Sequence, residues 1–212
     1  MRVVLVHGFN VHDYGARSVD MLAPGLFECG YVVDKDEADY GWFGLLGVRF
    51  RKANAIERIA CAIRKADAVI THSNGANFAH KAIELTEQNN EFKRGQRPLY
   101  VVHVSPALNR DAELPKSVTR CLVLHNKKDM AVQVARFLLF HPWGDMGAHG
   151  PTSPDPRYDS EDCSDFIKGH SAWFHGFAAT WTASMCCDWL KQNGHDNGKA
   201  TAHNPADRLP PD

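Results

Sequence analysis

The sequence predicts an α/β fold, a three-layer sandwich in which helices cover both faces of a mostly parallel sheet of about six strands. Two observations support this fold class. Short apolar or β-branched runs alternate along the chain with longer segments of helical periodicity, a pattern typical of βαβ units. The runs themselves, such as "VVLV" and "LYVVHV", are almost continuously apolar, as expected for parallel strands that are buried on both faces.

The first part of the chain supplies two of the expected strands. Residues 2–6, "RVVLV", form a β-branched run that ends at a His-Gly pair, and residues 31–34, "YVVD", form a second run. Between them, residues 15–30 are only weakly helical because a Pro-Gly pair interrupts the pattern. Residues 35–52 are irregular and rich in glycine and aromatic residues, and we predict no regular element there.

The next part reads as helix, strand and helix. Residues 53–66 are expected to be helical because apolar side chains recur at helical spacing, at Ile56, Ile59, Ala60 and Ile63. A strand at residues 67–72, "DAVITH", follows, and a second helix is expected at residues 75–88. This strand therefore lies between two helices, as it would in a parallel sheet.

The C-terminal half continues the same alternation. Apolar runs within residues 97–108 and within residues 119–126 predict two further strands, and residues 130–140 are helix-like. Residues 165–169, "DFIKG", are the candidate for a last short strand. Residues 171–192 are strongly apolar and predict a long closing helix, despite one internal glycine.

The length of 212 residues predicts one domain, and we place it at residues 1–192. Residues 193–212 are polar and contain proline, so we expect a loose tail. Residues 141–164 are rich in proline, glycine and aspartate. They are expected to form either a flap beside the substrate site or a surface insertion, because a loop of this length is usually functional or mobile.

The charge balance excludes some classes of partner. The chain has 24 basic and 25 acidic residues, so no excess of positive charge points to nucleic acid or to an anionic membrane. No apolar run approaches the roughly 18 residues of a membrane span, and the N-terminal run is too short for a secretory signal. We therefore expect a cytoplasmic protein, whose six scattered cysteines without a CxxC pair are reduced thiols.

The substrate site of a parallel α/β sheet is expected beyond the carboxyl ends of its strands. Four segments of this sequence meet that condition: residues 7–10, 72–75, 105–106 and 126–129.

A serine stands at one of these strand ends. The stretch "VITHSNGANFAHKAI", residues 69–83, takes the chain from a strand into a helix with Ser73 at the corner. A nucleophile elbow has the form small–x–Ser–x–small, because its tight turn leaves no room for large neighbours. Gly75 and Ala76 fit this form, whereas Thr71 departs from it. The alternative is a serine that caps the helix.

A serine nucleophile needs a base and a group that orients the base. Asp129 follows a strand in "CLVLHNKKDMAV", and His170 precedes the last helix in "DFIKGHSAWF", so the order is serine, acid, histidine. Helix capping by Asp129 and an ordinary loop histidine are the alternatives. The rival base is His175, which would lie inside the expected helix, and the rival acids are Asp111 and Asp165.

An oxyanion needs backbone N–H donors. We expect one from Asn74, directly after the serine, and one from Phe9, in the "VHGFN" loop that ends the first strand. The glycine of this loop would let the backbone turn toward the site, although it is also compatible with a simple turn. The residues expected to contact substrate are His7, Gly8, Asn10 and His72.

Taken together, "HGFN", "THSNGA", the aspartate of "HNKKDMAV" and the "GHS" at residues 169–171 resemble the α/β-hydrolase fold family, the serine hydrolases of the esterase and lipase type. The resemblance covers roughly residues 2–192. It implies Ser73 as nucleophile, His170 as base and Asp129 as orienter, with the oxyanion bound by Phe9 and Asn74. It also implies a fold that starts at the strand carrying the oxyanion loop, without the two antiparallel strands that usually come first. Because the chain is too short for the large helical cap that many family members carry, we expect a minimal fold.

The predicted function is hydrolysis of a small-molecule carboxylic ester of short to medium acyl chain through an acyl-enzyme, with no cofactor. Hydrolysis of an amide or thioester by the same triad is one alternative, and a non-catalytic binding protein on a hydrolase fold is another. A metal site at His141, Asp145 and His149 is disfavoured, because Pro142, Gly144 and Gly147 argue against the regular helix that this spacing needs.

Overall fold

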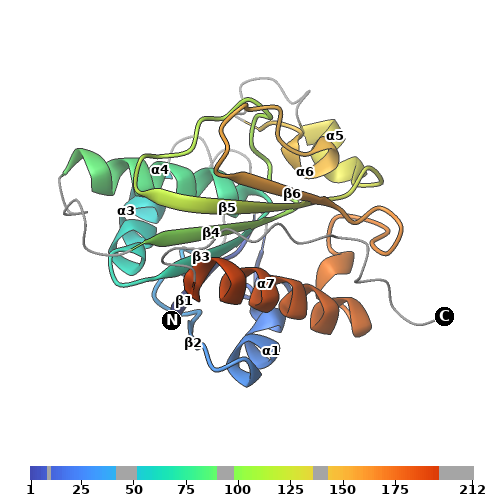
Figure 1. The fold of residues 1–212 in the computed structure, drawn as a ribbon, viewed down its shortest axis with the longest axis horizontal. Coiled ribbons are helices and arrows are strands. Elements are labelled where there is room, and N and C mark those ends of the chain that lie inside the picture. The colour runs from blue at the N-terminus through green and yellow to red at the C-terminus, as the bar shows by residue number, and fades with distance from the viewer. Residues whose placement is uncertain (9–10, 42–51, 90–97, 136–142, 196–212) are drawn as a thin grey trace.

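The computed structural model describes residues 1–8, 11–41, 52–89, 98–135 and 143–195. Its centre is one sheet of six strands in the order β2-β1-β3-β4-β5-β6, and every neighbouring pair is parallel (Figure 1). The strands are β1 (Arg2–Val6), β2 (Val32–Asp34), β3 (Ala68–His72), β4 (Leu99–Val104), β5 (Val118–His125) and β6 (Tyr158–Asp162). The predicted fold class is therefore confirmed.

Helices cover both faces of this sheet (Figure 1). One face carries α3 (Lys52–Ile63) and α4 (Asn74–Gln88). The other carries the short helices η1 (Val19–Leu22), α1 (Ala23–Glu28) and η2 (Ala172–Phe174) together with the long helix α7 (Phe177–His195). The small helices α5 (Met130–Ala135) and α6 (Met146–His149) follow β5 in the chain.

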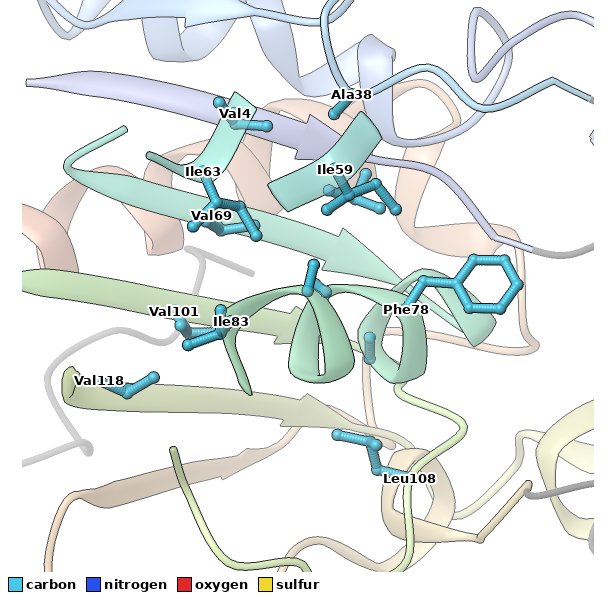
Figure 2. Packing of buried hydrophobic residues seen from close by; sticks show 14 of the residues in the cluster. Val4, Ala38, Ile59, Ile63, Val69, Phe78, Ile83, Val101, Leu108 and Val118 are labelled. Carbon is cyan, nitrogen blue, oxygen red and sulfur yellow. The ribbon is translucent and has the colours of Figure 1, made fainter. Parts of the chain in front are cut away.

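Two hydrophobic layers explain why the strands read as continuous apolar runs. Alternate strand residues such as Val4, Val69 and Val101 pack against Ile59 and Ile63 of α3 and against α4 (Figure 2). Their neighbours along the strands, Val3, Leu5, Ile70 and Val102, face the opposite layer. There they pack with residues of the helices on that side, among them Leu26 of α1, Trp173 of η2 and Leu190 of α7. Each central strand therefore buries both of its faces.

The strand order places the site. The chain builds β2 on one side of β1 and then returns to build β3 and the later strands on the other side. The strand order therefore reverses next to β1, and such a reversal opens a crevice at the carboxyl ends of the strands. Val6 is paired in register with Thr71 at this point, so His7, directly after β1, and His72, the last residue of β3, both lie at the crevice.

The last strand differs from the prediction. The structure places β6 at Tyr158–Asp162, whereas residues 165–169 form a turn and an irregular segment after it. Because β6 is an edge strand, its sequence "YDSED" is polar and lacks the apolar run that marks the buried strands. Residues 141–164 are therefore not a loop without regular structure, since they contain α6 and β6.

The predicted helix at residues 171–192 is divided in two. The short helix η2 ends before Gly176, whose φ of 52° breaks the helical path, and α7 begins at Phe177. Helix α7 then continues to His195, past the residue where we expected the tail to begin. Of the helix expected at residues 130–140, α5 covers the part up to Ala135, and residues 136–142 lie outside the described residues.

Candidate active site

Ser73 lies at the turn between β3 and α4, as the sequence predicts. Its backbone has a φ of 54° and a ψ of −125°, a conformation that non-glycine residues adopt only when the surrounding structure enforces it. In the described part of the chain, the Ser73 hydroxyl makes no capping bond to α4. The alternative of a helix-capping serine therefore has no bond to support it.

Two glycines let the first strand approach this turn. A Cβ at Gly75 would lie 2.3 Å from the His7 carbonyl oxygen and 2.6 Å from that of Val6. A Cβ at Gly8 would lie 2.9 Å from the Cβ of Ser73. Larger residues at either position would push the end of β1 away from the serine, so both glycines are required for close packing of the site.

Asp129 and His170 are joined directly. The His170 Nδ1 lies 2.7 Å from Asp129 Oδ2, and because a carboxylate only accepts, Nδ1 carries the hydrogen. This tautomer leaves the Nε2 of His170 free to accept a proton. The Oδ1 of Asp129 also accepts the N–H of Val132 at 3.1 Å, so the aspartate caps α5 as well.

Ser105 is a further partner of Asp129 that the sequence analysis did not assign. It follows β4, is fully buried and has a φ of 49°, and its hydroxyl donates to Asp129 Oδ2. Burial alone would raise the pKa of Asp129, but the hydrogen bonds from His170, Ser105 and Val132 outweigh burial and hold this pKa below its usual value. Asp129 is therefore a carboxylate at neutral pH.

His72 links the serine turn to the His170 loop. Burial lowers the pKa of His72 well below its usual value, and the nearby His170 adds to this, so the imidazole is neutral. Its Nε2 donates to the backbone carbonyl of His170 at 3.2 Å, and the two ring centroids are 4.6 Å apart. His170 therefore lies beside the turn that carries Ser73. Among the described residues, no hydrogen bond joins the Ser73 hydroxyl to His170, and such bonds often tighten only when substrate binds.

Asn74, the expected oxyanion donor after the serine, is held by its side chain. Asn74 is 1% exposed, and its Oδ1 accepts the indole N–H of Trp143 at 2.6 Å. The indole lies in the segment just before α6, so this segment is tied to the first turn of α4. The other expected donor, Phe9, and the expected substrate contact Asn10 lie outside the described residues.

His7 and Gly8, directly after β1, are held by contacts with Asp39 and Tyr40. His7 is 2% exposed, with its Nε2 3.2 Å from Asp39 Oδ1 and its Nδ1 3.0 Å from the Gly8 carbonyl oxygen. Tyr40 stacks on the His7 ring, with centroids 4.0 Å apart. The rings of His7 and of His72 are thus bonded to protein groups, and neither is open to solvent.

The rival residues are placed less favourably. His175 follows η2 outside any helix, contrary to the prediction, and it is exposed. Asp111 and Asp165 are also exposed, and Asp129 carries the bond to His170. His149 Nε2 lies 4.0 Å from Asp145 Oδ2, while His141 lies outside the described residues. In the described ranges, no group of three or more His, Cys, Asp or Glu side chains is arranged to hold a metal ion.

Two further properties of the described chain concern its helices and its cysteines. None of its helices is long and apolar enough to cross a bilayer, α7 included. Its cysteines are free thiols.

Comparisons with known proteins bear on the fold. No family model matches the chain, and no curated protein matches its sequence. Among solved structures, a hormone-sensitive lipase from a metagenome library is similar over 90% of this chain and 77% of its own, with 12% identity and a TM-score of 0.52. An esterase from Pyrococcus furiosus is similar over 90% of this chain and 80% of its own, with 15% identity and a TM-score of 0.47.

A protein from Xanthomonas campestris pv. campestris, assigned to the alpha/beta superfamily of hydrolases, is similar over 89% of this chain and 99% of its own, with 20% identity and a TM-score of 0.46. Identities this low establish likeness of fold alone. This chain, with its six-stranded parallel sheet and helices on both faces, is therefore similar in fold to the hormone-sensitive lipase.

Proposed function

We propose that this protein is a serine hydrolase that cleaves carboxylic esters. In this proposal Ser73 is the nucleophile, His170 is the general base and Asp129 orients His170. The observation that carries the proposal is the strained Ser73 turn, with φ of 54°, beside a histidine whose Nδ1 is bonded to a buried carboxylate. These are the parts that activate a serine hydroxyl.

The first half of the reaction transfers the acyl group to the enzyme. His170 Nε2 takes the proton of the Ser73 hydroxyl while the Oγ attacks the ester carbonyl carbon, and the carbonyl oxygen becomes an oxyanion. The backbone N–H groups of Asn74 and Phe9 stabilise this oxyanion. The ionised Asp129 stabilises the imidazolium of His170, which then protonates the departing alcohol as the carbon–oxygen bond breaks.

The second half releases the acid. His170, neutral again, takes a proton from a water molecule that attacks the acyl carbon, and the bond to Ser73 Oγ breaks as the serine regains its proton. Asp129 is already a carboxylate at neutral pH, so it supports the imidazolium in both halves. We also propose that His7, Gly8 and His72 line the substrate site, where their contacts to protein groups hold them in place.

The proposed substrate is an ester with a short or medium acyl chain. The described chain contains no large helical insertion that would enclose a long acyl tail, because the elements between β5 and η2 are short. The similarity to an esterase and a lipase concerns the fold alone, so the choice of an ester over an amide or a thioester is part of the proposal.

Two measurements test the proposal. A fluorophosphonate probe is expected to label Ser73, and the Ser73→Ala variant is expected to lose labelling and nearly all turnover of p-nitrophenyl esters while its thermal unfolding is unchanged. In a graded series of these esters, turnover is expected to peak at short or medium acyl length. Labelling of another serine, or full activity of Ser73→Ala, would contradict the assignment, and preference for long-chain emulsified lipids would contradict the substrate class.

A further inference from the structure

Tyr40 holds the backbone that leads from β1 to the expected oxyanion donor. Its hydroxyl lies 2.7 Å from the His7 carbonyl oxygen and 2.8 Å from the Gly8 carbonyl oxygen. A phenol carries one hydrogen, which these two acceptors share. Burial, reinforced by the charge of Asp39 and only partly offset by the nearby Asn74 side chain, raises the pKa of Tyr40 well above its usual value, so the hydroxyl keeps its hydrogen throughout the neutral range.

The ring of Tyr40 is fixed independently of its hydroxyl. It stacks on the His7 imidazole with an interplanar angle of 25°, and it meets Phe78 edge to face with ring centroids 5.0 Å apart. Phe78 belongs to the hydrophobic layer on this face of the sheet (Figure 2). Removal of the hydroxyl alone should therefore leave the ring in place.

Of the two carbonyls, that of Gly8 links Tyr40 to the candidate active site. Gly8 lies against Ser73, since a Cβ at Gly8 would be 2.9 Å from the serine Cβ. The Gly8 carbonyl is the described end of the peptide that supplies the second oxyanion donor in the proposed function. The phenol that holds this oxygen therefore anchors the Gly8 backbone beside the nucleophile.

We propose that Tyr40 is a positioning residue for oxyanion stabilisation, which it serves by holding the Gly8 peptide group through its hydroxyl. The inference rests on the proposed hydrolase function. In this proposal Tyr40 acts indirectly, through the His7 and Gly8 backbone, which must stay aligned when the negative charge develops. The ring nitrogen of His7 at 3.0 Å from the same oxygen provides a second, weaker support.

The proposal predicts a specific kinetic signature for Tyr40→Phe. An interaction that matters only when the oxyanion forms changes kcat and leaves KM almost unaltered. Loss of a direct oxyanion donor costs a factor of about 100 to 1,000 in kcat, so a residue that only aligns the donor should cost about tenfold or somewhat more. A trifluoromethyl ketone, which forms a tetrahedral oxyanion on the serine, should bind more weakly by the same factor.

Tyr158→Phe is the matched control. The Tyr158 side chain is also partly buried against the same hydrophobic layer, and its hydroxyl donates to the Ala112 carbonyl at 3.1 Å, a contact of the same kind in another part of the molecule. Both variants should lower the thermal unfolding midpoint by similar amounts. Only Tyr40→Phe should lower kcat and weaken ketone binding. A variant with 3-fluorotyrosine at position 40 keeps the hydroxyl and should restore both quantities.

The outcomes separate the inference from the function on which it rests. If Ser73→Ala kept its turnover, the proposed function would fail and the inference with it. If Ser73→Ala were inactive but Tyr40→Phe kept its kcat, only the inference would fail. It would also fail if Tyr40→Phe raised KM without changing ketone affinity, or if the 3-fluorotyrosine variant lost as much activity as Tyr40→Phe.

Discussion

The Ser105 hydroxyl donates a hydrogen bond to Asp129 of the proposed triad, and the substitution Ser105→Ala removes this hydroxyl alone. Ser105 is fully buried and donates to the same Asp129 oxygen that accepts the His170 Nδ1–H. In Ser105→Ala no water can replace the lost donor, so Asp129 keeps only the bonds from His170 and Val132. The pKa of Asp129 should rise, and the carboxylate should hold the imidazolium less firmly.

The magnitude follows from the nature of this bond. A hydrogen bond to a charged group is worth about 1.5 to 3 kcal/mol, and each 1.4 kcal/mol corresponds to tenfold in rate. Asp129 retains two other donors and can relax toward them, so we expect the lower end of the range. Ser105→Ala should therefore lower kcat/KM for a short p-nitrophenyl ester about tenfold, and it should lower the free energy of unfolding by about 1.5 kcal/mol.

Two further variants isolate the cause. Ser105→Gly also removes the hydroxyl but suits the φ of 49°, so it should lose as much activity as Ser105→Ala while recovering part of the stability. Ser117→Ala removes a hydroxyl that donates to Glu87 Oε1 at 2.6 Å, and it should keep full activity. Initial rates and urea unfolding measure both quantities. If Ser105→Ala kept more than half of the wild-type kcat/KM, the hydroxyl would have no role in holding Asp129.

Two other changes test the site and the core. His170→Ala should cost as much turnover as Ser73→Ala, since members of a triad act as a unit, whereas the exposed His175→Ala should have almost no effect; the reverse result in an ester assay would show that the base was misassigned. Burial lowers the pKa of His103 to about 3, whereas an unfolded histidine titrates near 6.5, so the unfolded chain takes up this proton first and acid destabilises the fold. Between pH 6.5 and pH 5 this proton uptake should lower the free energy of unfolding of the wild type by about 1.6 kcal/mol, and His103→Gln should lack that part of the loss when urea unfolding is measured at both pH values. An unchanged pH dependence would mean that His103 is not buried in the neutral form.

Much of the fold was predictable from local pattern. The strands that are buried on both faces carry continuous apolar runs, so β1, β3, β4 and β5 lie where the sequence predicts them. The edge strand β6 has no such run, and residues 165–169, where the sequence predicts the last strand, form a turn and an irregular segment in which Ile167 is buried. Periodicity identifies burial, and an edge strand with polar side chains buries too little to be recognised.

The candidate site was predictable only where one segment carries the signal. Ser73, Asp129 and His170 each stand at the end of an expected element and could be named from spacing. The supporting residues could not, because their partners are distant in sequence: Ser105 meets Asp129 across adjacent strands, and Tyr40 reaches back to Gly8 from an irregular segment. Such contacts depend on strand order, which the sequence pattern leaves open.

The charges of β6 have a consequence for association with other chains. An edge strand exposes backbone donors and acceptors that can recruit a strand from another molecule. In the sheet that the structure describes, one edge is β2, with three residues, and the other is β6, which carries Asp159, Glu161 and Asp162 within its five residues. Arg120 and Lys127 each lie 2.6 Å from one of these aspartates.

An incoming strand would have to desolvate these carboxylates and their cationic partners, while β2 offers too few residues to template an added strand. Parallel sheets gain most from such protection, because their long-range pairings form slowly and leave edges exposed while the chain folds. The polar sequence of β6, which gives it no apolar periodicity, therefore also disfavours aggregation through this edge of the sheet.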